Sequence, residues 1–221
     1  MECHFIHRKV SKKEKTVIDK IIELSLLSGG LLPMMALLLL LTLTIIIERT
    51  YFFYHVTSFG SSLERDLKLV TSNDQEKWRE LESHYRKTLQ ISIVSAAISA
   101  TSRKEESIKR VMEEAILWQI PKLERNIWVL DTSVTLAPLM GLLGTIIGMV
   151  HAFDILGVSG AGGASTQMIS GGIAEALVAT GAGIFIAILA VVFLNHFNKK
   201  VGNILHQMEL LKVMTLNRLV P

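Results

Sequence analysis

Three polar residues, Thr145, Glu175 and Thr180, lie in stretches of the sequence that are otherwise apolar. An ionisable side chain inside a membrane is costly and by default marks a functional site, so Glu175 is a candidate for ion movement. The threonine hydroxyls would then be polar points along a proton pathway. Two simpler interpretations stay open. In the first, Glu175 lies near the membrane surface or forms a structural bond between subunits. In the second, each threonine bonds only to its own helix.

Each threonine lies in a stripe of small residues that recur at helical spacings of three and four. The two stripes consist of Pro138, Gly141, Gly144 and Gly148, and of Ala176, Gly183 and Ala187. Small residues let helices pack closely in lipid, and the same stripes are suited to face a narrow central lumen. Glu175 lies about 140° around a helix from Thr180, so the two do not centre on one face.

Two further groups of residues are candidates for proton or metal chemistry. His151 and Asp154 are three residues apart at the outer end of an apolar stretch, where they form either a point at which protons enter or an interfacial hydrogen-bonded pair. Cys3, His4 and His7 are possible metal ligands, but a fourth ligand is missing, so we expect neither a metal site nor a cofactor. We find no catalytic motif and predict that the protein is not an enzyme.

The composition indicates a membrane protein. Half of the residues are hydrophobic and 19% are charged, which excludes disorder as the overall class, and a net charge of +3 is too small to suggest nucleic acid as a partner. Uncharged runs of 24 and 22 residues follow Glu23 and Asp131, and Glu175 is the only charge within residues 155–198. A membrane span requires about 20 apolar residues. We therefore predict transmembrane helices at residues 24–48, 131–153 and 169–196, with a loop at residues 154–168.

The distribution of Lys and Arg predicts the orientation in the membrane. None lies in the loop between the last two spans, whereas 13 lie between Glu48 and Leu130 and four follow Asn195. We expect the loop and the N-terminus outside and the C-terminus in the cytoplasm. Six Lys and Arg among residues 1–23 argue against this orientation.

The remaining segments have helical patterns. Apolar residues recur at helical spacing in residues 49–130, which predicts a cytoplasmic helical domain whose long helices continue the spans. Residues 91–100 are too short for a fourth span and are expected to form a buried bundle helix. Residues 1–23 are predicted to form an amphipathic segment, and residues 197–221 a cytoplasmic C-terminal helix. The fold class is therefore an all-α integral membrane protein with three transmembrane helices and long cytoplasmic helical extensions.

Two motifs resemble those of a known family. Residues 137–149 read APLMGLLGTIIGM and residues 172–180 read GIAEALVAT. They resemble the second-span and third-span motifs of the ExbB/TolQ/MotA family, in the family's order, and the specific resemblance covers residues 127–200. Gly171 and Leu189 stand where many members have proline. Residues 151–153 resemble TolQ more than ExbB. The motifs therefore do not assign the chain to one of these two branches.

The resemblance implies a subunit of a motor in the bacterial inner membrane, so that the outside is the periplasm. Such subunits assemble as a homopentamer around two copies of an ExbD- or TolR-like protein, whose single span carries a titrating Asp. Thr145, Thr180 and Glu175 match the family's polar channel residues, and the transported ion is H+. In an ExbB-like role the complex energises a TonB-like protein. A TolQ-like role in envelope constriction and a structural scaffold that conducts no ion remain alternatives.

Overall fold

The computed structural model describes residues 31–68, 75–86, 88–100, 104–158 and 164–219, all but the connecting residues in helices. Within these helices, the side chains of residues 58, 59, 61, 75, 155–158, 164–169 and 175 are not described. The chain divides into two compact units. Unit 1 comprises Met1–Thr44 and Leu130–Val191, and unit 2 comprises Ile45–Val129 and Val192–Pro221.

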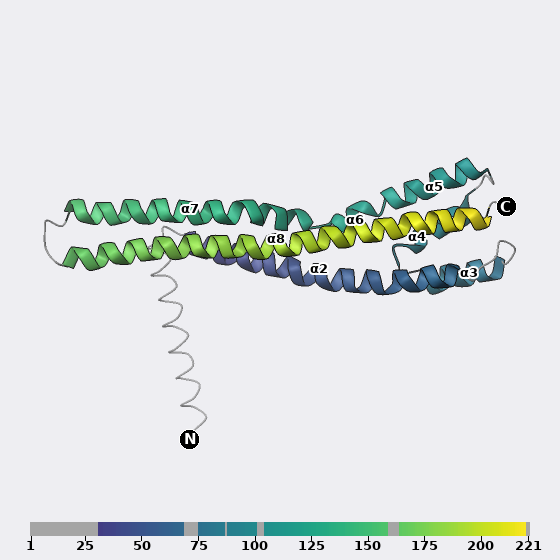
Figure 1. The fold of residues 1–221 in the computed structure, drawn as a ribbon, viewed down its shortest axis with the longest axis horizontal. Coiled ribbons are helices and arrows are strands. Elements are labelled where there is room, and N and C mark those ends of the chain that lie inside the picture. The colour runs from purple at the N-terminus through teal and green to yellow at the C-terminus, as the bar shows by residue number, and fades with distance from the viewer. Residues whose placement is uncertain (1–30, 69–74, 87, 101–103, 159–163, 220–221) are drawn as a thin grey trace, which may run out of the picture. The chain divides into compact units, whose positions relative to one another are not determined.

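Of the helices in the described ranges, three are long and apolar enough to cross a membrane. They are α2 (Leu31–Leu67), α7 (Ile127–Val158) and α8 (Ala164–Leu219), shown in Figure 1. Only 28% of the most apolar window of each is buried within the chain. The side chains that face outward are large and apolar, among them Leu37, Leu40, Leu139, Leu177 and Phe185. Such a surface is suited to lipid, because helices that are apolar all round require an apolar surrounding.

Unit 1 is held together by close contact between α7 and α8, which run side by side (Figure 1). A Cβ atom placed on Gly183 would lie 2.5 Å from the Ala137 carbonyl oxygen, and one on Gly141 would lie 3.0 Å from the Thr180 Cα. The helices therefore meet backbone to backbone. A buried hydrophobic cluster lies beside this contact. It consists of Leu31, Met35, Ala137, Met140, Ala179, Ile186 and Ala187.

Unit 2 has a mixed core of the kind found in water-soluble helical proteins. It includes α3 (Gln75–His84), α4 (Ile91–Ser99), α5 (Glu105–Leu117) and α6 (Ile120–Glu124). One buried cluster joins α2, α3, α4 and α8 through Leu63, Leu67, Trp78, Leu81, Tyr85, Ile91, Val94 and Leu211. The Tyr85 hydroxyl donates to the Asp66 carboxylate at 2.6 Å. Burial and this bond raise the pKa of Tyr85 to about 12, so the phenol stays protonated at neutral pH.

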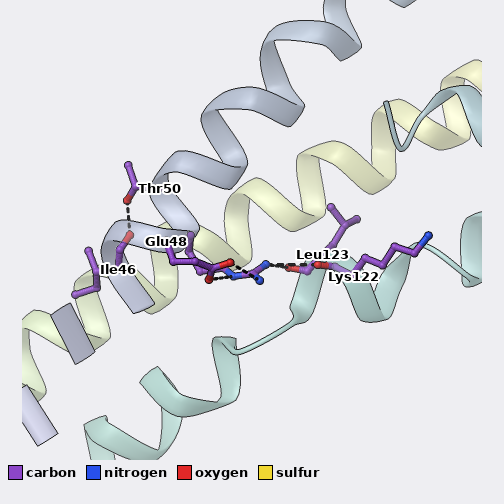
Figure 2. A network of polar contacts seen from close by, with 6 residues as sticks. Ile46, Glu48, Thr50, Lys122 and Leu123 are labelled. Carbon is purple, nitrogen blue, oxygen red and sulfur yellow. Dashed lines mark hydrogen bonds and ion pairs between the residues drawn. The ribbon is translucent and has the colours of Figure 1, made fainter. Parts of the chain in front are cut away.

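Arg49 is the largest polar side chain in the core of unit 2, where it is 1% exposed. Its guanidinium pairs with the Glu48 carboxylate at 2.8 Å and donates to the carbonyl oxygens of Lys122 and Leu123 at 3.4 Å (Figure 2). These carbonyls belong to the last turn of α6, whose groups have few partners within the helix. Asn126 follows with a φ of 61°, a left-handed conformation that Asn tolerates. Arg49 thus fastens the bend between α6 and α7 to α2.

A second buried cation, Lys212, fastens α8 to α5. Its Nζ lies 2.6 Å from a Glu209 oxygen and 3.3 Å from a Glu113 oxygen. Burial alone lowers the pKa of Lys212, but hydrogen bonds and the charges of both carboxylates outweigh it and raise the pKa above its ordinary value. Because the raised pKa belongs to the folded state, this stabilisation is present at neutral pH and is lost as the pH rises beyond the ordinary range of lysine.

The helical fold with three candidate spans confirms the prediction from the sequence. Residues 91–99 form the short buried helix α4, which packs on α5. The boundaries predicted at residues 48, 130 and 196 fall inside continuous helices, and α7 and α8 extend into the predicted loop 154–168 from both sides. The amphipathic segment predicted at residues 1–23 lies outside the described residues.

Replacement of Gly183 by Ala is expected to destabilise unit 1, because the new methyl group meets the Ala137 carbonyl and neither backbone can yield cheaply. Overpacking of this kind costs about 1–3 kcal/mol. Gly181→Ala on the same helix is the matched control, because nothing lies within 4 Å of its Cβ position. Thermal unfolding in detergent should show a lower Tm for Gly183→Ala only. Equal Tm values for the two variants would contradict the backbone contact.

Arg49→Met is expected to loosen the bend after α6, because the carbonyls of Lys122 and Leu123 lose their side-chain donor while the aliphatic stem is kept. Loss of a partner for buried polar groups costs about 1–3 kcal/mol. Limited trypsin digestion followed by mass spectrometry should show faster cleavage after the exposed Arg125. Lys68→Met removes an exposed ion pair with Glu64 and should leave this cleavage rate unchanged.

Candidate functional site

Thr180 joins the two helices of unit 1 that carry the sequence motifs. It lies on α8, is half-buried, and its hydroxyl donates to the carbonyl oxygen of Gly141 on α7 at 2.9 Å. The bond forms because Gly141 has no side chain to hold the backbones apart. Of the three polar residues predicted from the sequence, Thr180 is therefore the one whose described hydrogen bond crosses between helices.

Thr145 makes a local bond instead. Its hydroxyl donates to the Leu142 carbonyl oxygen of its own helix at 2.7 Å. A hydroxyl has one hydrogen and two lone pairs, so a hydroxyl that donates to a carbonyl still accepts hydrogen bonds. In this arrangement Thr145 and Thr180 both present acceptor oxygens. An acceptor suits a protonated carboxylic acid, which can donate, and does not suit an ionised carboxylate, which cannot.

Glu175 lies on α8, one turn before Ala179. The continuous helix places it about 140° around the axis from Thr180, as the sequence predicts. Ala179 is buried in the contact with α7, where its Cβ lies 2.9 Å from the Cβ position of Gly144. The side chain of Glu175 is outside the described part of the structure, so only its place on the helix is known.

The stripe residues meet at the contact between α7 and α8. The Cβ position of Gly148 is 2.8 Å from the Ala176 Cβ, and that of Gly183 is 3.2 Å from the Gly141 Cα. Backbone and methyl groups of the opposite helix thus occupy the space that larger side chains would need. Ala187 belongs to the core cluster beside this contact, and Pro138, inside α7, is half-buried.

His151 and Asp154 are both exposed at the end of α7 that precedes α8. Among the described residues neither makes a hydrogen bond or an ion pair, so the pair that their spacing suggested is not formed. A spacing of three places the two side chains on neighbouring parts of a helix face. No group of three or more metal-ligating side chains occurs in the described ranges, and Cys3, His4 and His7 lie outside them.

A buried polar contact between α2 and α7 was not predicted from the sequence. The hydroxyl oxygens of Thr42 and Ser133 are 3.1 Å apart, and both residues are 0% exposed. The Thr42 hydroxyl also lies 2.8 Å from the Leu38 carbonyl oxygen. Nothing in the sequence distinguishes Thr42 from the exposed Thr44, which makes the equivalent local bond to Leu40. Thr42 differs from Thr44 because it has a hydrogen-bond partner on another helix, Ser133 of α7.

Comparison with known proteins agrees with the resemblance of the two motifs. Residues 79–210 match the MotA/TolQ/ExbB proton channel family, a range that includes Thr145, Glu175 and Thr180. The chain is 32% identical over 176 residues to a protein named putative biopolymer transport protein ExbB-like 1 from Synechocystis, and the match covers 79% of this chain and 69% of the relative.

Two further relatives match a shorter part of the chain. The Tol-Pal system protein TolQ of Haemophilus influenzae is 42% identical over 95 residues, which cover 43% of this chain and 41% of TolQ. The biopolymer transport protein ExbB of Xanthomonas campestris is 35% identical over 96 residues, which cover 43% of this chain and 37% of that protein. With its three candidate spans and its match over more than half its length, the chain belongs to the MotA/TolQ/ExbB proton channel family of multi-pass membrane proteins.

Proposed function

We propose that this chain is an ExbB-like subunit of a motor in the bacterial inner membrane, and that the motor converts proton-motive force into mechanical work. The family match across both motif-bearing helices carries the proposal. The chain would form a homopentamer around two copies of an ExbD- or TolR-like protein. The N-terminus and the loop before α8 would face the periplasm, and the C-terminus the cytoplasm. The Lys and Arg of residues 49–130 and of the segment after Asn195 support this orientation, whereas the six among residues 1–23 argue against it.

The directions of the hydrogen bonds made by the Thr145 and Thr180 hydroxyls suggest how the pathway distinguishes the neutral from the ionised form of the partner's aspartate. A proton from the periplasm neutralises this aspartate, with His151 and Asp154 at the outer end of α7 as the proposed point where it enters. The neutral carboxyl donates to the acceptor oxygens of Thr145 and Thr180, whose own hydrogens are held by backbone carbonyls. The ionised form finds no donor there and is held back by the apolar surroundings. The proton is then released to the cytoplasm, and Glu175 lies at a subunit boundary or at the mouth of the path.

The available energy is sufficient for mechanical work. Each elementary charge that crosses a potential of 100 mV supplies about 2.3 kcal/mol. Because a pentamer and the dimer inside it differ in symmetry, each proton would rotate one of them by a step relative to the other. A few protons per cycle would therefore drive a sizeable conformational change in a TonB-like protein.

A TolQ-like role in a Tol-Pal system is the second candidate. The 42% identity to TolQ over 95 residues supports it, whereas the longer match to an ExbB-like protein supports the first role. Both roles use the same subunit chemistry and differ in the protein that receives the work. A structural scaffold that conducts no ion is the alternative from another class, because the close helix contact also serves packing alone.

Thr180→Val is expected to abolish proton flux while the complex still assembles, because valine keeps the shape and loses the hydroxyl oxygen. Thr180→Ser keeps the oxygen and should retain flux. The measurement is dye-monitored acidification in vesicles that contain the chain and its single-span partner, with size-exclusion chromatography as the check on assembly. Full flux in Thr180→Val would remove the role proposed for this hydroxyl.

Glu175→Gln distinguishes the motor from the scaffold. The motor interpretation predicts reduced proton flux, since the substitution removes the one charge within residues 155–198. The scaffold interpretation predicts no flux in the native complex and no effect of the substitution. Copurification of a single-span protein that bears a transmembrane aspartate, at about two copies per five of this chain, would support the motor. Its absence from the purified native complex would count against the motor.

A further inference from the structure

Unit 2 contains a polar cavity that the proposed function does not use. Its volume is 630 Å³, and α3, α4 and α6 supply its walls together with the connection between α3 and α4. Three cationic side chains line it, those of Arg79, Arg86 and Lys122, against one carboxylate, that of Glu82. The walls therefore carry a net positive charge, which selects an anionic ligand.

Hydrogen bonds arrange part of this lining in advance. The Lys122 ammonium donates to the Gln119 side-chain oxygen at 3.0 Å, and the Gln119 nitrogen donates to the Ser92 hydroxyl at 3.1 Å. The ammonium has three hydrogens, so two remain for a ligand. The Glu82 carboxylate accepts a bond from the Ser95 hydroxyl at 2.8 Å. Among the described residues Arg79 forms no ion pair that would compete with an anion for its guanidinium.

A second cavity adjoins the first and has a different character. Its volume is 830 Å³, and Tyr51, Phe52 and Val56 of α2 provide much of its apolar wall. Arg86 and Leu89 line both cavities, as do Ser83 and Thr88, so the polar and apolar spaces meet along a shared wall. Both volumes lie within the range of about 300–1,000 Å³ that is typical of ligand sites.

The two cavities lie beside the first charged residues that follow the uncharged stretch of α2. Glu48 lines the apolar cavity and is the first charged residue after the uncharged stretch of α2. Its neighbour Arg49 bonds to the carbonyl of Lys122 (Figure 2). The side chain of Lys122 lines the polar cavity. This bond brings the wall of the polar cavity to the level of the first charged residues of α2. Because the uncharged stretch of α2 belongs to a candidate membrane span, we expect lipid headgroups to reach this part of the chain.

We propose that the two cavities form one binding site for an anionic phospholipid, with the phosphate between Arg79, Arg86 and Lys122 and part of an acyl chain against Tyr51, Phe52 and Val56. A free phosphate would leave the apolar cavity unused. A zwitterionic lipid lacks the net negative charge that the cationic walls select. The site is separate from Thr145, Glu175 and Thr180, so the proposal stands whether or not the motor function is correct.

The test uses the full chain purified in detergent, with dioleoyl phosphatidylglycerol and dioleoyl phosphatidylcholine as probes of equal acyl composition. Native mass spectrometry should show selective retention of phosphatidylglycerol. Arg79→Gln combined with Arg86→Gln should reduce this retention by about tenfold or more, since each basic residue contributes to the attraction of anionic lipid. Both arginines are exposed, so the fold should persist.

Lys109→Gln combined with Arg110→Gln is the matched control. It removes the same charge from exposed positions on α5 that line neither cavity, and it should leave lipid retention unchanged. Equal retention of the two lipids by the native chain would overturn the proposal. An equal loss in both double variants would also overturn it, because that result would indicate attraction by overall charge.

A further variant separates a lipid from a free anion. Tyr51→Asp introduces a carboxylate into the apolar cavity at an exposed position and should lower the retention of phosphatidylglycerol. Inorganic phosphate added at millimolar concentration should displace little of the lipid from the native chain. Undiminished retention in Tyr51→Asp, or complete displacement by phosphate, would show that the cavity binds phosphate without an acyl chain and would overturn the proposed ligand.

Discussion

The backbone contact between α7 and α8 is the constraint on which unit 1 depends. Helices in lipid gain little from hydrophobic burial, because the surrounding tails are as apolar as their side chains. Association must come from close packing and hydrogen bonds. Gly141, Gly144, Gly148 and Gly183 permit that approach, and the bond from the Thr180 hydroxyl to the Gly141 carbonyl exists only because of it. A larger side chain at any of these positions would separate the helices and remove the bond.

Bonds to backbone carbonyls give the two threonines their chemical character, for Thr180 across the contact and for Thr145 within its own helix. A hydroxyl in water donates and accepts without preference, whereas a hydroxyl whose hydrogen is held by a backbone carbonyl is left as an acceptor. Thr145 and Thr180 are held in this way by Leu142 and Gly141. In the proposed motor, this preference would allow a protonated carboxyl to pass and would hold back the ionised form. The pathway would then discriminate by hydrogen-bond direction, with no need for a fixed charge beside the threonines.

Unit 2 is stabilised by other interactions than unit 1. Its core buries aromatic and aliphatic side chains as water-soluble proteins do, and its buried charges are paired: Arg49 with Glu48 and two carbonyls, Lys212 with two carboxylates. An unpaired charge at either position would be strongly unfavourable. These anchors fix the short helices α5 and α6, which are too short to be stable alone. Of these two helices, α6 lines the cationic cavity, together with α3, α4 and the connection between α3 and α4.

The sequence by itself determined the helical class, three candidate spans and the positions of Thr145, Glu175 and Thr180 within them. The length of an uncharged run and the helical period are local properties of the chain, and they depend on whether the surroundings are lipid or water. The sequence also showed that small residues share a face. Only the tertiary structure decided which backbone those faces meet, that Thr180 bonds across helices while Thr145 bonds within its own, and that Thr42 pairs with Ser133. It also decided that Arg49 is buried. Hydrogen-bond partners distant in sequence depend on how helices are placed in space, and no periodicity along one chain encodes that placement.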